Sequence, residues 1–213
     1  MSRPHFLDRT EAGELLASKL LHYRGTNAVI LAIPRGGVPV GHALARVLGL
    51  PLDILQVKKI GHPVNREFAI GAVSPDALIL DERFEFPVDF VQKEVARIRA
   101  EMEEQARTYR GDHAPLDLRG RTVIVVDDGV ATGHTLLATI DLVRRSKPAH
   151  LVVAMPVVPA NFVPKGREVA DEFIHLIAPA DLMSVGQYYG SFAPVEDAEV
   201  VRMLNEHWNP SRT

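Results

Sequence analysis

Residues 123–135 constrain this chain more than any other part of its sequence. An unbroken apolar run ends in two adjacent carboxylates, Asp127 and Asp128, and a turn of small and hydroxyl-bearing residues follows. A helical pattern begins directly behind that turn, at Leu136. This order is typical of a buried strand that delivers acidic groups at its carboxyl end and leads through a tight turn into a helix. Such a turn exposes backbone N–H groups at the amino end of a helix, where anions bind.

Strands and helices alternate along the chain. The clearest unit is an apolar strand at 28–33, a turn at 34–37, a helix at 38–48 and a strand at 53–57, which implies parallel strands joined by a crossover. The other predicted elements are a helix at 8–23, a hairpin or sheet edge at 68–80, an amphipathic helix at 90–109, strands at 151–157 and 173–177, a helix at 163–170 and a helix from 195. We therefore predict one α/β domain, residues 1–213, with a mainly parallel, Rossmann-like sheet flanked by helices.

Composition excludes several classes of function. The 213 residues include no cysteine, which excludes disulfides, thiolate catalysis and cysteine-ligated zinc. The 24 basic and 27 acidic residues give a net charge of −3, without the basic excess of a nucleic-acid-binding surface. The chain shows neither an apolar run of about 20 residues nor a signal-peptide core, so we expect no membrane segment and a cytoplasmic location.

Three segments are expected to meet at one edge of the sheet: 34–37, 58–66 and 127–135. Ligands of open α/β sheets bind beyond the carboxyl ends of the strands, near the point where the strand order reverses. Two neighbouring carboxylates can accept hydrogen bonds from a ribose diol and lie close to Mg²⁺, although an Asp-rich turn that caps a helix has the same pattern. The small residues behind them predict a phosphate cradle that is not a P-loop, because the G-x-x-x-x-G-K pattern is missing.

The family resemblance follows from these segments. Residues 127–135, with the apolar run before them, resemble the phosphoribosyl-pyrophosphate (PRPP) signature of the type I phosphoribosyltransferases. The sequence Pro34-Arg35-Gly36-Gly37 resembles that family's pyrophosphate-binding loop, and residues 58–67 lie where the family has a mobile catalytic flap. In this order the three segments cover about residues 25–160. The flanking segments 68–73 and 185–189 resemble a bacterial subgroup whose acceptor is undefined.

The resemblance implies transfer of 5-phosphoribosyl from Mg²⁺-bound PRPP to a nitrogen acceptor, a nucleobase, with release of pyrophosphate. The catalytic residues it implies are Arg35, Lys58, Lys59 and Asp128. The PRPP-binding residues it implies are Arg35, Gly36, Asp127, Asp128, Gly129, Val130, Ala131, Thr132, Gly133, His134 and Thr135. Asp127 and Asp128 would hold the metal through water or ribose. Members of the family are often homodimers, and by analogy we expect the same here.

Two regions are expected to complete the site. Residues 58–80 would form the flexible flap, and residues 178–213 a hood over the acceptor. Tyr188 and Tyr189 are candidates for stacking on a planar base, although the alternative, in which they pack the tail onto the sheet, is favoured. At the position of Ala131, family members that act on 6-oxopurines carry an acidic residue that exchanges a proton with the base. An alanine cannot do this, so we predict weak or no activity on hypoxanthine and guanine.

Alternative functions remain open at this stage. A sensor of PRPP or nucleotides with the same fold would carry the same signature, and a partner-binding α/β domain would need no PRPP. A dinucleotide site at Gly36-Gly37 with Asp53 downstream fits poorly, because the G-x-G-x-x-G spacing is absent. The apparatus for a leaving diphosphate, Arg35 with Lys58 and Lys59, favours the enzyme.

Overall fold

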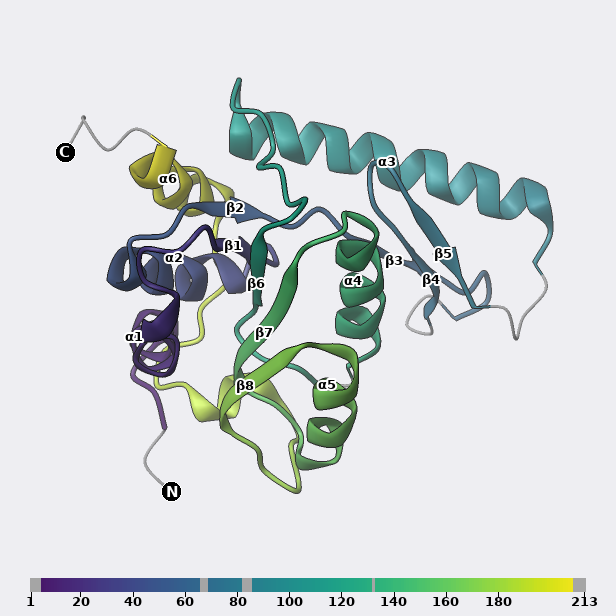
Figure 1. Ribbon diagram of the computed structural model, residues 1–213. Helices are drawn as coiled ribbons and strands as arrows, with labels where there is room; N and C mark the ends of the chain where they lie inside the picture. The colour runs from purple at the N-terminus through teal and green to yellow at the C-terminus, as the bar shows by residue number, and fades with distance from the viewer. Residues whose placement is uncertain (1–4, 66–68, 82–85, 132, 209–213) are drawn as a thin grey trace.

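The computed structural model describes residues 5–65, 69–81, 86–131 and 133–208. Its centre is a five-stranded sheet with the order β2-β1-β6-β7-β8, in which every neighbouring pair is parallel (Figure 1). The strands are β1 (Val29–Ala32), β2 (Leu52–Ile54), β6 (Thr122–Val126), β7 (His150–Val157) and β8 (Glu172–Ile177). The predicted α/β class with a mainly parallel sheet is confirmed.

One face of this sheet packs against three helices. Successive side chains of a strand point to opposite faces, and Ile30 and Ile124 lie on the same one. They share a buried core with α1 (Arg9–Lys19), α2 (Gly37–Leu48) and α6 (Asp197–Trp208). The first two of these helices come from the start of the chain and the third from its end, and α2 contacts both α1 and α6 (Figure 1).

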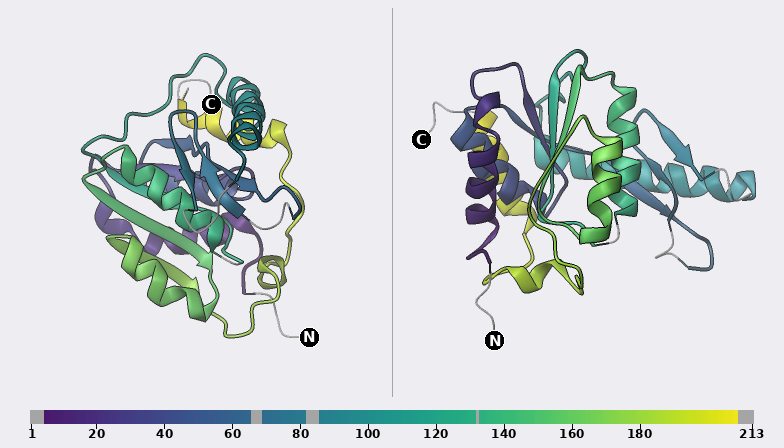
Figure 2. Two further views of the ribbon diagram at one scale, coloured as in Figure 1. Left: turned by 90° about the vertical axis from the view of Figure 1, so that its right-hand side faces the viewer. Right: turned by 60° about the horizontal axis from the view of Figure 1, so that its bottom comes forward.

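Two helices cover the opposite face. Leu31 and Val125, the next residues along their strands, pack into a second core with α4 (His134–Arg145) and α5 (Val163–Val169) (Figure 2). Burial on both faces explains why these strands are apolar throughout instead of alternating. Short 3₁₀ helices join the layers: η1 (Leu21–Tyr23), η2 (Ala160–Phe162) and η3 (Val185–Tyr188). Within the described part of the chain, no helix is both long enough and apolar enough to cross a membrane.

A second, smaller sheet extends from the main domain. Strands β3 (Lys58–Gly61), β4 (Ala69–Val73) and β5 (Leu78–Leu80) are antiparallel and lie beside the long helix α3 (Val88–Arg110), as Figure 1 shows. The predicted hairpin and amphipathic helix are therefore confirmed. The lysines, glycine and proline of residues 58–66 are typical of a polar loop, but the first four residues of this segment form β3. Ile60 explains the difference, because this fully buried residue anchors the segment against α3.

A buried ion pair fastens α3 to the central sheet. Arg110 Nε donates to Asp53 Oδ1 at 2.9 Å, and the two side chains are only 7% and 3% exposed. The remaining groups are also satisfied, because Arg110 donates to the carbonyl of Ile54 at 2.8 Å and Asp53 accepts from the Leu116 N–H at 3.0 Å. A buried pair of this kind fixes geometry, and removing one partner leaves an uncompensated charge.

A pair of histidines between α2 and α6 predicts a loss of stability in mild acid. His207 Nε2 lies 3.1 Å from His42 Nδ1, and His42 Nε2 lies 3.3 Å from Glu206. Burial, with the neighbouring His42, lowers the pKa of His207 to about 4, and burial also lowers the pKa of His42. The unfolded chain therefore binds more protons than the folded one between pH 6.5 and 4, so stability falls as the pH drops through this window.

We expect the free energy of unfolding to fall by about 1–2 kcal/mol between about pH 7 and pH 5 because of this pair. Urea denaturation of the natural chain and of His207→Gln measures it. The substituted chain should lose less stability than the natural one, and His22→Asn, at an exposed histidine, should behave like the natural chain. Equal losses in all three would contradict the assignment.

Candidate active site

The predicted site forms where two neighbouring strands end. In the sheet order, β1 leads through α2 to β2 on one side and pairs with β6 on the other, so the strand order reverses between β1 and β6. Residues 34–37 follow β1 and Asp127-Asp128 follow β6 at the same edge. Ligands of open α/β sheets bind at such a switch point.

The turn after β1 packs directly onto the two carboxylates. A Cβ atom placed on Gly36 would lie 2.2 Å from Asp128 Oδ2, and one on Gly37 would lie 2.9 Å from the Asp127 Cα. A side chain at Gly37 would meet backbone atoms, and one at Gly36 would displace the Asp128 carboxylate. The peptide bond between Pro34 and Arg35 is cis. The expected meeting of segments 34–37 and 127–135 is therefore present in the structure.

The two carboxylates share a largely buried environment. Asp127 Oδ1 accepts the backbone N–H of Asp128 at 2.8 Å. Burial, together with the charge of Asp128, raises the pKa of Asp127 well above its ordinary value. Burial also raises the pKa of Asp128, although the guanidinium of Arg9 acts in the opposite direction. Two like charges held together out of water favour a ligand that supplies positive charge or hydrogen-bond donors.

Arg9 is a site residue that the sequence reasoning missed. It is the first residue of α1, and its Nε donates to Asp128 Oδ2 at 2.9 Å. The two residues are 119 positions apart, and nothing in the local sequence of either one indicates the contact. Asp128 is also held by its backbone, because Tyr189 Oη donates to its carbonyl at 2.6 Å.

The turn after the carboxylates leads into α4 as predicted. Gly133 precedes the helix with a left-handed backbone (φ = 80°), and its carbonyl accepts the N–H of Leu137 at 2.9 Å. A cavity of about 230 Å³ lies at this turn; it is lined by Ile33, Asp127, Gly129, Val130, Ala131, Gly133, Leu136 and Met155. Thr132 and the side chains of His134 and Thr135 lie outside the described residues. The cavity and the amino end of α4 give a phosphate group a place beside the carboxylates.

Arg35 lies at the rim of the site with two partners that the sequence did not indicate. Its Nη1 is 3.5 Å from Asp197 Oδ1, and the side chains are 46% and 57% exposed. Tyr109 Oη donates to the same oxygen at 2.6 Å. Exposed pairs contribute little to stability, so Arg35 can leave Asp197 for a ligand at small cost.

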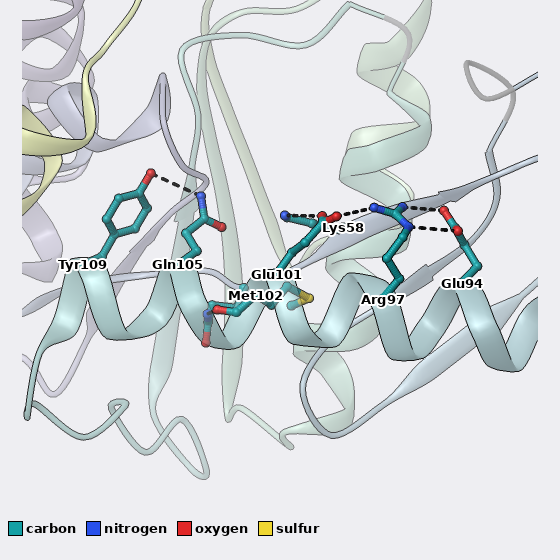
Figure 3. Close-up of polar contacts among 8 residues, drawn as sticks. Lys58, Glu94, Arg97, Glu101, Met102, Gln105 and Tyr109 are labelled. Carbon is teal, nitrogen blue, oxygen red and sulfur yellow. Dashed lines mark hydrogen bonds and ion pairs between the residues drawn. The ribbon is translucent and has the colours of Figure 1, made fainter.

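The two lysines at the start of β3, Lys58 and Lys59, have different surroundings. Lys58 Nζ lies 3.2 Å from Glu101 Oε2 on α3. Glu101 also pairs with Arg97, and Arg97 pairs with Glu94, so the four side chains form a row of ion pairs (Figure 3). Neighbouring side chains of a strand point to opposite faces, so Lys59 lies on the face of β3 away from α3, where α4 approaches. The structure therefore separates two residues that the sequence treats as one feature.

The two adjacent tyrosines of the tail, Tyr188 and Tyr189, also have different surroundings. Tyr189 is 6% exposed, and its ring lies between Phe6 and Phe192, with centroids at 5.3 and 5.0 Å. Burial raises its pKa, which keeps the proton on the hydroxyl that donates to the Asp128 carbonyl. Tyr189 therefore has the packing role, the alternative to base stacking. Tyr188 is partly exposed and contacts the His5 ring at 5.6 Å, so acceptor stacking stays a prediction for this residue alone.

The two carboxylates fit a magnesium ion that the protein would hold only in part. Within the described residues, no group of three or more acidic or histidine side chains is arranged to hold a metal. Mg²⁺ commonly binds through one or two carboxylates, water and substrate phosphates, and does not need a cage made of protein alone. Asp127 and Asp128 offer such a pair, whose repulsion the ion would relieve.

Comparison with known proteins agrees with this geometry. The phosphoribosyl transferase domain model matches residues 7–172. The Mycobacterium tuberculosis H37Rv protein Rv0571c, named only as a candidate phosphoribosyl transferase, is 36% identical over 208 residues; the match covers 94% of this chain and 46% of that protein. The chain thus spans about half the length of this relative. The crystal structure of TT1426 from Thermus thermophilus is 38% identical, covers 95% of this chain and 99% of that one, and superposes with a TM-score of 0.85. The chain belongs to the phosphoribosyl transferase domain family.

Proposed function

We propose that this chain transfers 5-phosphoribosyl from Mg²⁺-bound PRPP to a ring nitrogen of a nucleobase and releases pyrophosphate. The observation that carries the proposal is the packing of Gly36 onto Asp128. It brings the turn after β1, which resembles a pyrophosphate-binding loop, next to the two carboxylates at the end of the neighbouring strand β6. Family membership supports the same reaction class.

Each segment has a separate task in this reaction. Arg35 and the N–H of Gly36 would stabilise charge on the departing pyrophosphate, and Asp127 and Asp128 would hold the ribose hydroxyls. The turn at 129–135 would bind the 5′-phosphate at the amino end of α4. The C1–O bond breaks as the acceptor nitrogen bonds to C1, so catalysis depends on positioning and on preorganised charge. Mg²⁺ would neutralise part of the diphosphate charge.

Lys59 is proposed as the flap lysine that meets the diphosphate. Lys58 lies on the face of β3 toward α3, where it pairs with Glu101, whereas Lys59 lies on the face toward α4, the helix that begins at the proposed phosphate turn. We expect Lys59→Met to lower kcat about 10- to 100-fold and Lys58→Met to lower it less than about threefold. Steady-state kinetics with saturating acceptor measures both. A larger loss for the Lys58 variant would reverse the assignment.

The acceptor is proposed to lack a 6-oxo group. Ala131 is exposed at the edge of the 230 Å³ cavity and carries no group that can exchange a proton with the base. With Mg²⁺ and PRPP, we expect adenine or another base without a 6-oxo group to support pyrophosphate release. Hypoxanthine and guanine should support less than about 1% of that rate, a difference of roughly 3 kcal/mol in the barrier. Efficient turnover of either would refute this acceptor class.

The same assay, with Mg²⁺, PRPP and each base in turn, tests the proposed function as a whole. Pyrophosphate release that depends on one base would establish transfer and identify the acceptor. PRPP that raises the melting temperature without any release would favour a PRPP sensor over an enzyme.

A further inference from the structure

We infer that Arg9 is a positioning residue for Asp128. Arg9 holds one oxygen of the Asp128 carboxylate and leaves the other oxygen to the ribose of PRPP. The inference deepens the proposed function and rests on it. It extends the site to α1 and to Phe192 and Ala193 of the tail, which lie beyond the region that matches the family model, residues 7–172.

Three contacts fix the guanidinium of Arg9. Its Nε donates to Asp128 Oδ2 at 2.9 Å, and its Nη1 donates to the Ala193 carbonyl at 2.9 Å. Its Cζ lies 3.8 Å from the centroid of the Phe192 ring, a cation–π distance. The Arg9 and Asp128 side chains are only 11% and 15% exposed. Contacts on several sides, out of water, give this pair one defined geometry instead of the loose pairing of surface charges.

The consequence for Asp128 is a fixed orientation. Oδ2 is held by Arg9 and faces Gly36, while the backbone carbonyl accepts the Tyr189 hydroxyl at 2.6 Å. Among the described residues, no side chain donates a hydrogen bond to Oδ1. This oxygen is therefore the one that a ribose hydroxyl or a metal-bound water can use.

The charge of Arg9 also matters for a polyanionic substrate. Asp127 and Asp128 together would repel PRPP, and the guanidinium offsets one of these charges beside the site. A lysine could restore the charge, but it lacks the planar fork that reaches the carboxylate and the Ala193 carbonyl at once and stacks on Phe192.

Binding of Mg²⁺·PRPP to four variants tests the role. Arg9→Met should weaken PRPP binding on the order of 10- to 100-fold, and Arg9→Lys should restore part of it. In steady-state kinetics, the KM for PRPP should rise while the KM for the acceptor stays within about twofold. Phe192→Leu should give a weaker effect of the same kind, because it loosens Arg9 without touching the carboxylate. Arg202→Met, at an exposed arginine of α6, is the matched control and should bind as the natural chain does.

A double-mutant cycle separates positioning from mere packing. In the Asp128→Asn background, Arg9→Met should weaken PRPP binding by less than about threefold, because the partner it orients has already lost its charge. Equal weakening in both backgrounds would overturn the inference, as would an Arg9→Met chain that binds PRPP like the natural protein. If Arg9→Met does not fold, the same criterion applies to Arg9→Lys and Phe192→Leu. A natural chain that itself fails to bind Mg²⁺·PRPP would refute the proposed function and this inference with it.

Discussion

Asp127→Asn is expected to make the protein more stable and nearly inactive. Burial and the neighbouring Asp128 penalise the ionised form of Asp127, and asparagine removes that charge. Its amide oxygen can still accept the Asp128 N–H, as Asp127 Oδ1 does at 2.8 Å. We expect kcat/KM for PRPP to fall about 10²- to 10³-fold, while the free energy of unfolding rises by about 1 kcal/mol at about pH 7.

The pH dependence of this gain has a definite sign. A raised carboxyl pKa costs stability at any pH where the group is ionised, so the gain should be present at neutral pH. It should shrink as the pH falls toward the ordinary carboxyl pKa of about 4 and vanish below that value, where the carboxyl is neutral in both the folded and the unfolded chain. Chemical denaturation at neutral pH and at about pH 4 measures it, with Asp112→Asn, at an exposed carboxylate, as the control. A less stable Asp127→Asn chain, or an active one, would contradict the account.

Gly36→Ala should weaken PRPP binding strongly without unfolding the protein. The new methyl group would lie 2.2 Å from Asp128 Oδ2, so the carboxylate has to move away from its position against Arg9. The atom that moves is the end of a side chain, so the cost in stability is small. The cost in function is large, because the misplaced group is the one that we propose binds ribose. We expect binding of Mg²⁺·PRPP to weaken at least about 100-fold, with a melting temperature within about 3 °C of the natural value.

Gly25→Ala gives the opposite result and serves as the control. Gly25 has a left-handed backbone (φ = 74°), and no heavy atom lies within 4 Å of a Cβ placed there, so alanine is strained but touches nothing. Its free energy of unfolding should fall by about 1 kcal/mol while PRPP binding is unchanged. Differential scanning fluorimetry and calorimetric titration on both variants test the pair. If Gly36→Ala binds PRPP normally, the turn is not part of the site.

The sequence predicted those parts of the fold that depend on local pattern. Patterns among neighbouring residues are enough to predict the apolar strands, the helices between them and the turn at 127–135 that begins with two carboxylates. The switch-point rule then placed 34–37 beside Asp127 and Asp128 correctly. Local pattern failed at Lys58, because two lysines and a proline-punctuated stretch obscured a strand that Ile60 anchors.

Contacts between the ends of the chain were beyond such reasoning. Arg9 reaches Asp128 only because α1 and the tail pack side by side against the sheet, where Phe6 pairs with Tyr189 in an isolated bridge. Which of two adjacent tyrosines is buried depends on that pairing and on no periodicity in the tail itself. The same limit explains why Asp197 was missed as a partner of Arg35.

Calorimetric titration of Mg²⁺·PRPP into the natural chain tests the central claim most directly. The account predicts saturable binding at one site per chain, weakened at least about tenfold when Mg²⁺ is removed. A folded chain that releases no heat of binding and shows no shift in melting temperature at millimolar Mg²⁺·PRPP would contradict the assignment of Asp127, Asp128 and the turn behind them.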